Sequence, residues 1–276
     1  MPVALHEPGH KYVNDETGEV YTSVSTLLKL YTPVFDPNGE IAAGCARKRS
    51  KELGRTVTVE EIKAEWKKKA DISTERGTYI HALLEDFIKK GKTVPIYDKN
   101  YNAIAKFSKE SFDGQLQSEL CVWMDEYKLA GTMDLAEFIP GEVPRAAVYD
   151  FKTNAKINYT SRYENKRGEV TYEHLLGPLS HLQNCEWVKY SLQMSIYSYM
   201  LELKGYTMNT PYIFWVQMET NKEYDEFIGA DFAVDYKLTD MKRIACPYLR
   251  SDVINLLNDY KTRYLKPVKE PALQVA

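Results

Sequence analysis

The spacing of apolar residues changes from helical to strand-like and back again between residues 75 and 218. In the segment 74–90, Ile80, Leu84 and Ile88 fall four residues apart and form one apolar stripe, which is typical of an amphipathic helix. Short segments rich in β-branched and aromatic residues follow, then a second apolar helix and one more strand. This order of helix, three strands, helix and strand predicts a single α/β core.

The remaining elements follow from the same patterns. We expect strands at 117–124, 126–139, 145–153 and 210–219, and helices near 100–111 and at 186–204. The last of these strands is nearly continuous in apolar residues, as a central strand would be. A polar strand near 225–235 and a terminal helix near 236–263 complete the chain. The polar segment 154–184 is long for a plain connection and predicts a functional loop or insertion.

The first 73 residues form an elaboration before this core. We expect a hairpin over 10–22, then a short helix that is capped by Ser23 or Ser25 and stops before Pro33. Helices are expected in 40–70, which is rich in Lys, Arg and Glu. This charge run is either a solvated surface or an arch that contacts phosphates over a nucleic-acid channel. We therefore divide the chain into two regions, an N-terminal hairpin and basic helical region (1–73) and a core with a C-terminal helix (74–276). We expect the two regions to make one compact unit.

Composition limits the classes of protein. The formal net charge is −3, so any contact with nucleic acid must come from a local basic patch. The four cysteines are widely spaced and include no C-x-x-C pair, which argues against a zinc ribbon and a disulfide-rich secreted scaffold. The N-terminus lacks the pattern of a signal peptide, and no stretch approaches the length of a membrane-spanning helix. We expect a soluble intracellular protein with no membrane partner.

Two short motifs carry the strongest chemical signal, G-T-M-D at 131–134 and Y-D-F-K-T at 149–153. Asp150 and Lys152 lie two apart on an expected strand, so their side chains leave the same face, and Asp134 lies on the strand before. Two converging carboxylates bind a hard divalent cation such as Mg²⁺. Such a cation lowers the pKa of a bound water and polarises a phosphate, and a nearby lysine stabilises charge on phosphorus. The trio has the parts needed for phosphodiester hydrolysis.

Alone, D-x-K is a weak pattern, because a pair of solvent-facing charges at a strand end explains most isolated matches. Here further residues occur in a fixed order around it: Gly77, His81, Glu85, Glu119, Gly131, Asp134, Asp150, Lys152, Gln193 and Tyr197. They match G-x-x-x-H-x-x-x-E on a helix, an acid on the first strand, G-x-x-D, D-x-K and Q-x-x-x-Y on a later helix. The chain over 77–197 resembles the RecB-like branch of the PD-(D/E)XK nucleases, in which these elements occur in the same order.

The resemblance implies a restriction-endonuclease-like core, a mixed sheet in the order α-β-β-β-α-β flanked by helices. It implies Mg²⁺ or Mn²⁺ as cofactor, and these metal-binding residues: His81, Glu85, Asp134, Asp150 and the backbone carbonyl of Phe151. Lys152 would serve the attacking water, and Glu119 would be a supporting acid, as would Glu85. Gln193 and Tyr197 would brace the site or contact the DNA backbone. Outside this constellation, a lone histidine on a helix, or a Gln and a Tyr one turn apart, would carry no such meaning.

One departure and two absences refine the resemblance. Met133 stands where the superfamily name has proline. Relatives that hold an iron–sulfur cluster have three cysteines close together after the core, whereas Cys185 and Cys246 are far apart, so we expect no cluster. No G-x-x-x-x-G-K-[ST] loop is present, so we expect no ATP-driven motor.

The N-terminal region extends the resemblance. A hairpin, then S-V-S-T-L-L, then a basic helical region is similar to the mitochondrial genome maintenance exonucleases and related phage exonucleases. This likeness implies that 40–70 covers the active site and admits only a threaded single strand with a free end. It also implies the cytoplasm of a bacterial or phage-infected cell, or an organelle matrix, as the compartment.

We therefore expect a metal-dependent DNA exonuclease that acts from single-stranded ends in replication, recombination or repair. Its partner would be DNA, with a replication or recombination protein as a further candidate. The alternatives are a duplex-specific exonuclease of the lambda type, an endonuclease, a DNA-binding module without activity, and an α/β protein that shows these motifs by accident.

Overall fold

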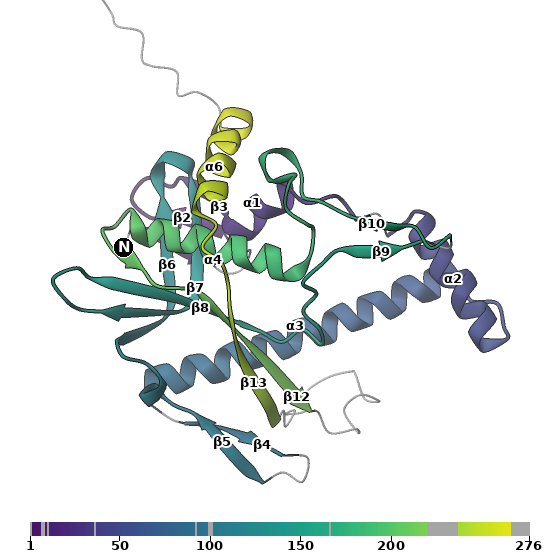
Figure 1. Cartoon of the computed structure of the whole chain (residues 1–276), viewed down its shortest axis with the longest axis horizontal. Coiled ribbons are helices and arrows are strands. Elements are labelled where there is room, and N and C mark those ends of the chain that lie inside the picture. The colour runs from purple at the N-terminus through teal and green to yellow at the C-terminus, as the bar shows by residue number, and fades with distance from the viewer. Residues whose placement is uncertain are drawn as a thin grey trace, which may run out of the picture.

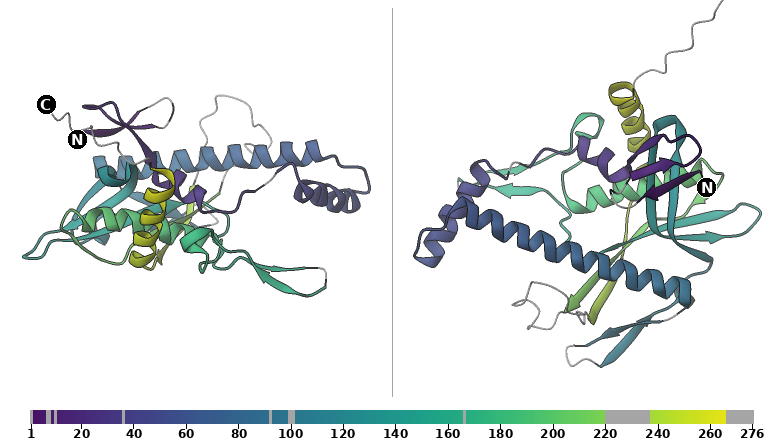
Figure 2. Two further views of the ribbon diagram at one scale, coloured as in Figure 1. Left: turned by 90° about the horizontal axis from the view of Figure 1, so that it is seen from above. Right: turned by 180° about the vertical axis from the view of Figure 1, so that it is seen from behind.

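A mixed β-sheet forms the centre of the protein, with one long helix on one face and two helices on the other (Figures 1 and 2). The computed structural model describes residues 2–6, 9, 11–35, 37–91, 93–98, 102–165, 167–219 and 237–265. The long helix is α3 (Val59–Lys90), and the two opposite helices are α4 (Glu186–Glu202) and α6 (Arg250–Tyr264). The α/β class expected from the sequence is confirmed. None of the described helices is long and apolar enough to cross a membrane.

Nine strands of the described residues build the sheet, in the order β1-β2-β3-β7-β8-β12-β13, with β6 paired to β7 and β11 paired to β8. Their bounds are β1 Val3–His6, β2 Lys11–Asn14, β3 Val20–Ser23, β6 Gln115–Met124, β7 Leu129–Ile139, β8 Arg145–Lys152, β11 Thr207–Met208, β12 Tyr212–Glu219 and β13 Lys237–Ala245. The expected strands at 117–124, 126–139, 145–153 and 210–219 are thus present. Strand β8 pairs antiparallel with β7 and parallel with β12, which makes the sheet mixed.

The N-terminal hairpin is part of this sheet. Strands β2 and β3 pair as expected, and β3 runs parallel to β7, with Thr22 beside Leu129. Helix α1 (Val24–Leu30) follows at once, and Ser23 is its cap, because the Ser23 hydroxyl accepts a hydrogen bond from the backbone N–H of Thr26 at 3.0 Å. The hairpin therefore lies against the strand that carries Asp134.

Helix α3 begins at Val59 rather than at residue 74 and runs for 32 residues. Thr58 and Glu61 form a capping box at its start, and Gly91 ends it with a left-handed φ of 68°. Its first half has few apolar residues, and ion pairs one turn apart stabilise it, such as Lys67–Asp71 at 2.6 Å. Apolar periodicity alone therefore locates only the second half, and the boundary expected after residue 73 falls inside the helix.

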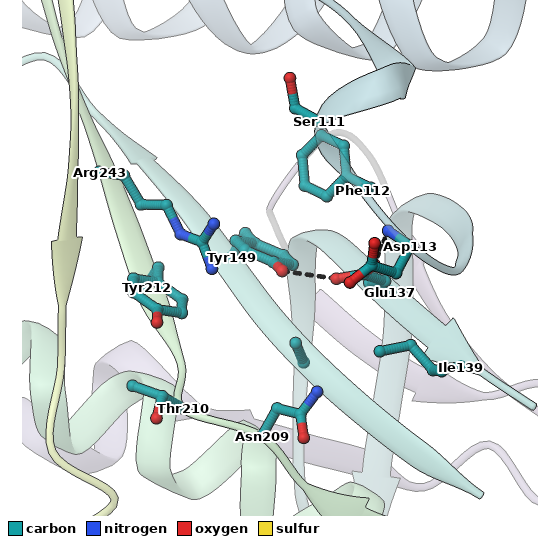
Figure 3. Close-up of a pocket in the computed structure, with 11 residues that line it drawn as sticks. Ser111, Phe112, Asp113, Glu137, Ile139, Tyr149, Asn209, Thr210, Tyr212 and Arg243 are labelled. Carbon is teal, nitrogen blue, oxygen red and sulfur yellow. Dashed lines mark hydrogen bonds between the residues drawn. The ribbon is translucent and has the colours of Figure 1, made fainter.

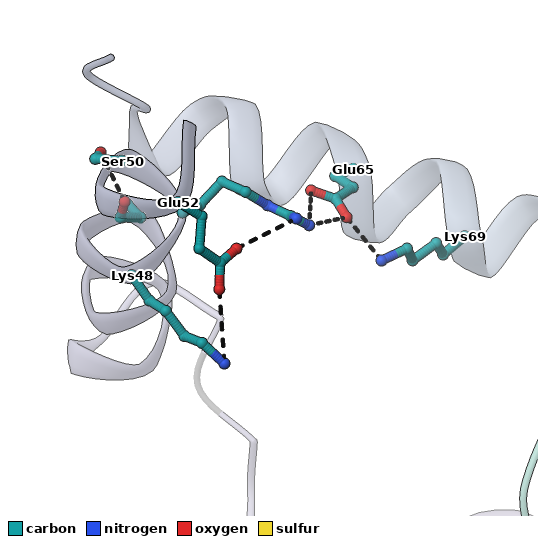
Figure 4. Close-up of polar contacts among 7 residues, drawn as sticks. Lys48, Ser50, Glu52, Glu65 and Lys69 are labelled. Atoms are coloured by element: carbon teal, nitrogen blue, oxygen red, sulfur yellow. Dashed lines mark hydrogen bonds and ion pairs between the residues drawn. The ribbon is translucent and has the colours of Figure 1, made fainter. Parts of the chain in front are cut away.

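Helix α2 (Glu40–Leu53) packs on the first turns of α3, which agrees with the helices expected in 40–70. A small core of Ala46, Val57 and Ile62 joins the two helices. On the surface, Glu65 of α3 accepts hydrogen bonds from Arg49 of α2 at 2.9 Å and from Lys69 at 2.7 Å (Figure 4). We call residues 40–74 the arch, because this pair of helices extends well beyond the sheet (Figure 1).

The helix expected near 100–111 is wrong. Strands β4 (Val94–Tyr97) and β5 (Ala103–Phe107) pair as a hairpin, and a single 3₁₀ turn follows. Phe107 is buried, with its ring centroid 4.9 Å from that of Phe87 and 5.2 Å from that of Phe214. The strand is selected by this contact with α3 and β12, which lie far away in the sequence.

The terminal helix expected over 236–263 is wrong in its first part. Residues 237–245 form β13, which pairs antiparallel with β12 along its length, and α6 begins only at Arg250. Pro247 separates the two, because a proline disfavours helical backbone in the residue before it. The polar strand expected near 225–235 lies outside the described residues.

The polar segment 154–184 contains a small hairpin of β9 (Arg162–Glu164) and β10 (Val170–Tyr172), followed by a 3₁₀ turn at Gly177–Leu179. Both the hairpin and helix α2 extend beyond the sheet, on the same side of the molecule (Figure 2). The segment is thus an ordered projection rather than a plain loop.

The sheet separates two hydrophobic cores. One contains buried residues of α1, α4 and α6, and the other contains the apolar stripe of α3 and the β4–β5 hairpin. Along β8, Tyr149 and Phe151 enter the α3 core, while Val148 enters the α4 core. Asp150 and Lys152 alternate with the former pair and so share the α4 side of the strand, as their spacing predicts.

Phe107→Ala should lower the free energy of unfolding by about 3–5 kcal/mol, because it leaves a cavity among buried aromatic rings. Urea denaturation measures this change. Phe35→Ala is the matched control: its side chain is exposed, and the expected change is within about 0.5 kcal/mol. Equal effects of the two substitutions would contradict the placement of β5 in the core.

Candidate active site

The two aspartates predicted from the sequence lie where strands β7 and β8 separate. The hydrogen-bonded ladder between these strands ends at the pair Leu135–Tyr149. Past that pair, β7 continues beside β6, and β8 continues beside β12. Asp134 and Asp150 are the first residues on either side of this fork. The fork therefore brings two carboxylates from neighbouring strands to one opening in the sheet.

Asp134 is held from two sides. One carboxylate oxygen, Oδ2, accepts a hydrogen bond from the backbone N–H of Phe151 at 2.8 Å. The other, Oδ1, lies 3.3 Å from Nδ1 of His81 on α3. Its side chain is 12% exposed, so these partners rather than water fix its orientation.

His81 reaches the fork because α3 packs its apolar stripe against the sheet. Ile80 and Leu84 are fully buried on that stripe, and His81 stands beside them at its border. Burial favours the neutral imidazole, but the hydrogen bond and charge of Asp134 outweigh it and raise the pKa of His81. The helix thus places an imidazole nitrogen beside the carboxylate of Asp134 on β7.

Glu119 completes a compact group of possible ligands. The register of β6 and β7 places it opposite Asp134, and its backbone has a φ of 49°, a strained value for a residue other than glycine. Ligand atoms of His81, Glu119 and Asp134 all lie within 4.8 Å of one another. Burial and the charge of Asp134 raise the pKa of Glu119 to about 7. One imidazole and two carboxylates could hold a divalent cation, and carboxylate oxygens are the ligands that Mg²⁺ and Mn²⁺ favour.

Asp150 is the most deeply buried acid of the group, with a side chain 4% exposed. Burial and the charge of Asp134 raise its pKa, even though the Lys152 ammonium contacts its Oδ2 atom. That oxygen has no hydrogen bond of normal geometry. Neighbouring acids, one of which is deeply buried, fit a divalent cation, which would supply further positive charge.

Lys152 lies between Asp150 and an aromatic ring. Its Nζ atom is 4.8 Å from the ring centroid of Tyr190 on α4. The Tyr190 hydroxyl donates a hydrogen bond to Oδ1 of Asn154 at 2.8 Å, and the Asn154 carbonyl accepts one from Nε1 of Trp215 at 2.7 Å. Burial disfavours the charged lysine, but Asp150 and Asp134 outweigh it and raise the pKa of Lys152. The lysine is a cation fixed beside the carboxylates.

The sequence analysis missed Tyr190 and Asn154. Asn154 continues the two-residue spacing of Asp150 and Lys152, and Tyr190 precedes Gln193 by one helical turn. Both signals were present in the sequence, but neither residue type stands out on an amphipathic helix or at a strand end.

Gln193 and Tyr197 lie on α4 below β7. Tyr197 is 4% exposed, and burial raises its pKa although a hydrogen bond with Gln193 acts in the opposite direction. A Cβ atom at Gly131 would come within 2.6 Å of the Tyr197 ring, so only glycine fits there. Tyr197 therefore supports the stretch of β7 that ends in Asp134.

Glu85 and Phe151 differ from the other predicted ligands. Glu85 forms an ion pair with Lys89 one turn further along α3, and it is not in the compact group of His81, Glu119 and Asp134. Its charge does contribute to the raised pKa of Glu119. For Phe151, the backbone N–H is engaged by Asp134, and the role of its carbonyl stays a prediction.

Another buried acid, Glu137, is a carboxylate whose hydrogen-bonding needs are met, in contrast to Asp150. It lies at a separate cavity of about 270 Å³, which Tyr212 and Arg243 also line (Figure 3). Its oxygens accept hydrogen bonds from Tyr149 at 2.6 Å and from the backbone N–H groups of Asp113 and Gly114 at 2.7 and 2.8 Å. Glu137 therefore has three hydrogen-bond donors, whereas Oδ2 of Asp150 at the fork has no hydrogen bond of normal geometry.

Gly131→Ala should destabilise the protein by about 1–3 kcal/mol, because the new methyl group would collide with Tyr197. Gly77→Ala is the matched control: no atom lies within 4 Å of its added Cβ, and alanine stabilises a helix interior by about 0.5–1 kcal/mol. Thermal or urea unfolding of the two variants measures both values. A loss of stability in both would contradict the close contact at Gly131.

The raised pKa of Glu119 predicts how stability depends on pH without divalent cations. The folded-state pKa of about 7 exceeds the ordinary 4.5, so the folded protein keeps a proton that the unfolded chain releases. Relative to Glu119→Gln, the free energy of unfolding of the wild type should fall as pH rises from about 4.5 to 7, and then level off. Urea titrations in a chelator test this, and parallel curves for the two proteins would refute it. Added Mg²⁺ should restore stability more at pH 8 than at pH 5, because it binds the ionised carboxylates.

Comparison with known proteins adds little. No protein-family model and no curated protein matches the chain. A solved structure titled "Crystal structure of SSO0001" aligns with 87% of this chain and 75% of the other at 11% identity, with a TM-score of 0.30. A likeness of that size supports no conclusion on fold or function.

Proposed function

We propose that this protein is a metal-dependent nuclease that hydrolyses phosphodiester bonds of DNA, on a restriction-endonuclease-like core. The observation that carries the proposal is the meeting of Asp134 and Asp150 at the fork between β7 and β8, with Lys152 beside them and His81 facing them from α3. Separate elements supply these groups, so their convergence is more specific than any one motif.

The chemistry follows from the groups present. His81, Glu119, Asp134 and Asp150 would hold Mg²⁺ or Mn²⁺, which when bound polarises the phosphate and acidifies a water. Lys152 would stabilise the negative charge that grows on the phosphate oxygens during attack. Asp134 orients the site through the N–H of Phe151 and through His81.

The charge distribution supports DNA as the substrate. The arch carries nine basic and six acidic residues, a net charge of +3 in a chain whose total is −3. Most of its basic residues are paired, but three lysines make no ion pair among the described residues: Lys51, Lys63 and Lys68. These unpaired lysines on the arch would attract the phosphates of DNA, whereas the acidic residues at the fork would bind the metal ion.

We further propose that the enzyme is an exonuclease that acts from single-stranded ends in replication, recombination or repair. The support is that helices α2 and α3 project from the sheet as one arch, and that α3 continues from it to His81. Such a projection suits a strand that enters by its end. A duplex-specific exonuclease of the lambda type and a DNA-binding module without activity are the alternatives that the following experiment separates.

Lys152→Ala should lower kcat by about 10²–10³-fold, because it removes one preorganised stabiliser of transition-state charge. End-labelled linear and circular DNA, single- and double-stranded, is digested with Mg²⁺ and resolved on gels. Lys156→Ala is the matched control, an exposed lysine four residues further along. Loss of linear single strands only would support the exonuclease, and preferential loss of duplex ends would support the lambda type. Binding of DNA without cleavage by the wild type would support the binding module.

If the arch contacts phosphates, the affinity for DNA should depend on salt concentration through its unpaired lysines. Replacing Lys51, Lys63 and Lys68 by alanine should weaken DNA binding at low salt. Each lost phosphate contact should reduce the slope of log Kd against log salt by about 0.7 for a single strand. Fluorescence anisotropy at several salt concentrations measures the slope. Lys67→Ala is the control, since Lys67 is already paired with Asp71, and an equal effect of this variant would count against the arch as the phosphate contact.

A further inference from the structure

Lys152 is a cation at the fork whose position depends on a flexible side chain. Four rotatable carbons carry its ammonium, and such a side chain has many rotamers of similar energy. Its ammonium contacts Oδ2 of Asp150 on the same strand. A lysine that serves a phosphate needs a second partner that keeps it in the site when a cation engages this carboxylate.

The ring of Tyr190 provides the second contact of the Lys152 ammonium. The ammonium lies 4.8 Å from the ring centroid, within the range of a cation–π interaction. The two partners of Lys152 lie on different elements, since Asp150 belongs to β8 and Tyr190 to α4. The ammonium is thus held between the sheet and the helix.

Tyr190 is itself held in place. Its hydroxyl donates to Oδ1 of Asn154 at 2.8 Å. The Asn154 carbonyl in turn accepts hydrogen bonds from Nε1 of Trp215 at 2.7 Å and from Nε2 of Gln217 at 3.3 Å, both on β12. Through Asn154, the ring is therefore linked to the end of β8 and to β12.

We propose that Tyr190 is a positioning residue that holds the Lys152 ammonium beside the reacting phosphate, through its ring face. The inference rests on the proposed nuclease function. When a cation engages the Asp150 carboxylate, that carboxylate attracts Lys152 less strongly. The Tyr190 ring then becomes the main partner that keeps the lysine in the site. The ring acts through Lys152 and does not itself touch the reacting atoms.

Two substitutions separate the ring from the hydroxyl. Tyr190→Phe keeps the ring and loses only the bond to Asn154, whereas Tyr190→Leu keeps an apolar side chain and loses the π face. Tyr199→Leu is the matched control on the same helix. The Tyr199 ring centroid lies 5.7 Å from Cζ of Arg250, outside the site. Circular dichroism and thermal unfolding establish that each variant is folded.

Nuclear magnetic resonance of protein with ¹³C-labelled lysine reads the position of Lys152 without any reaction. The ring current of Tyr190 should shift the Cε protons of Lys152 upfield in the wild type and in Tyr190→Phe, and this shift should vanish in Tyr190→Leu. Lys152→Arg assigns the signal. An unchanged Lys152 signal in a folded Tyr190→Leu protein would overturn the proposal.

Kinetics of Mg²⁺-dependent DNA cleavage test the consequence. Tyr190→Leu should lower kcat about 10–100-fold, the usual cost of losing a residue that supports an active group, with little change in KM. Tyr190→Phe should recover most of that loss, and Tyr199→Leu should behave as the wild type. A wild-type kcat in Tyr190→Leu would refute the positioning role. If the wild type cleaves nothing, the proposed function fails, whereas the resonance comparison still decides whether Tyr190 holds Lys152.

Discussion

The hydrogen bond from the backbone N–H of Phe151 to the carboxylate of Asp134 is the contact on which the rest of the site depends. When β7 and β8 separate after the pair Leu135–Tyr149, each strand loses a neighbour, and a buried donor without a partner would be costly. The side chain of Asp134 takes the place of the lost strand for this donor. The sheet can therefore open without leaving this donor unpaired, and side chains from its two faces, His81 from α3 and Tyr190 from α4, reach the same opening.

The opening concentrates negative charge in a way that a purely structural sheet would avoid. Burial, and after it the charge of Asp134, raise the pKa of both Glu119 and Asp150. Glu119 also keeps a strained backbone. By contrast, Glu137 is as buried as Asp150 but accepts hydrogen bonds from three donors. The acids at the fork thus lower the stability of the fold, whereas Glu137 does not. Such a local loss of stability is typical of a binding site.

The sequence predicted elements whose pattern is local and failed where distant contacts decide. The stripe of Ile80, Leu84 and Ile88, the strands that carry Asp134 and Asp150, and the cap at Ser23 follow from spacing and side-chain chemistry, and all are present. Strand β5 depends on the contact of Phe107 with Phe87 and Phe214, which no local window contains. Strand β13 similarly depends on pairing with β12. At the site, the spacing placed Lys152 on the correct face, but its contact with Tyr190 exists only because α4 packs against β8.

Helix α3 joins the two regions into which the sequence analysis divided the chain, 1–73 and 74–276. At 1.5 Å per residue, its 32 residues span about 48 Å without a break, from the junction with α2 to beyond His81. A continuous helix is stiff, because every turn is hydrogen-bonded to the next. The arch and His81 therefore belong to one rigid helix, which Ile80 and Leu84 fix against the sheet. A displacement of the arch along the helix axis would also shift His81 relative to Asp134.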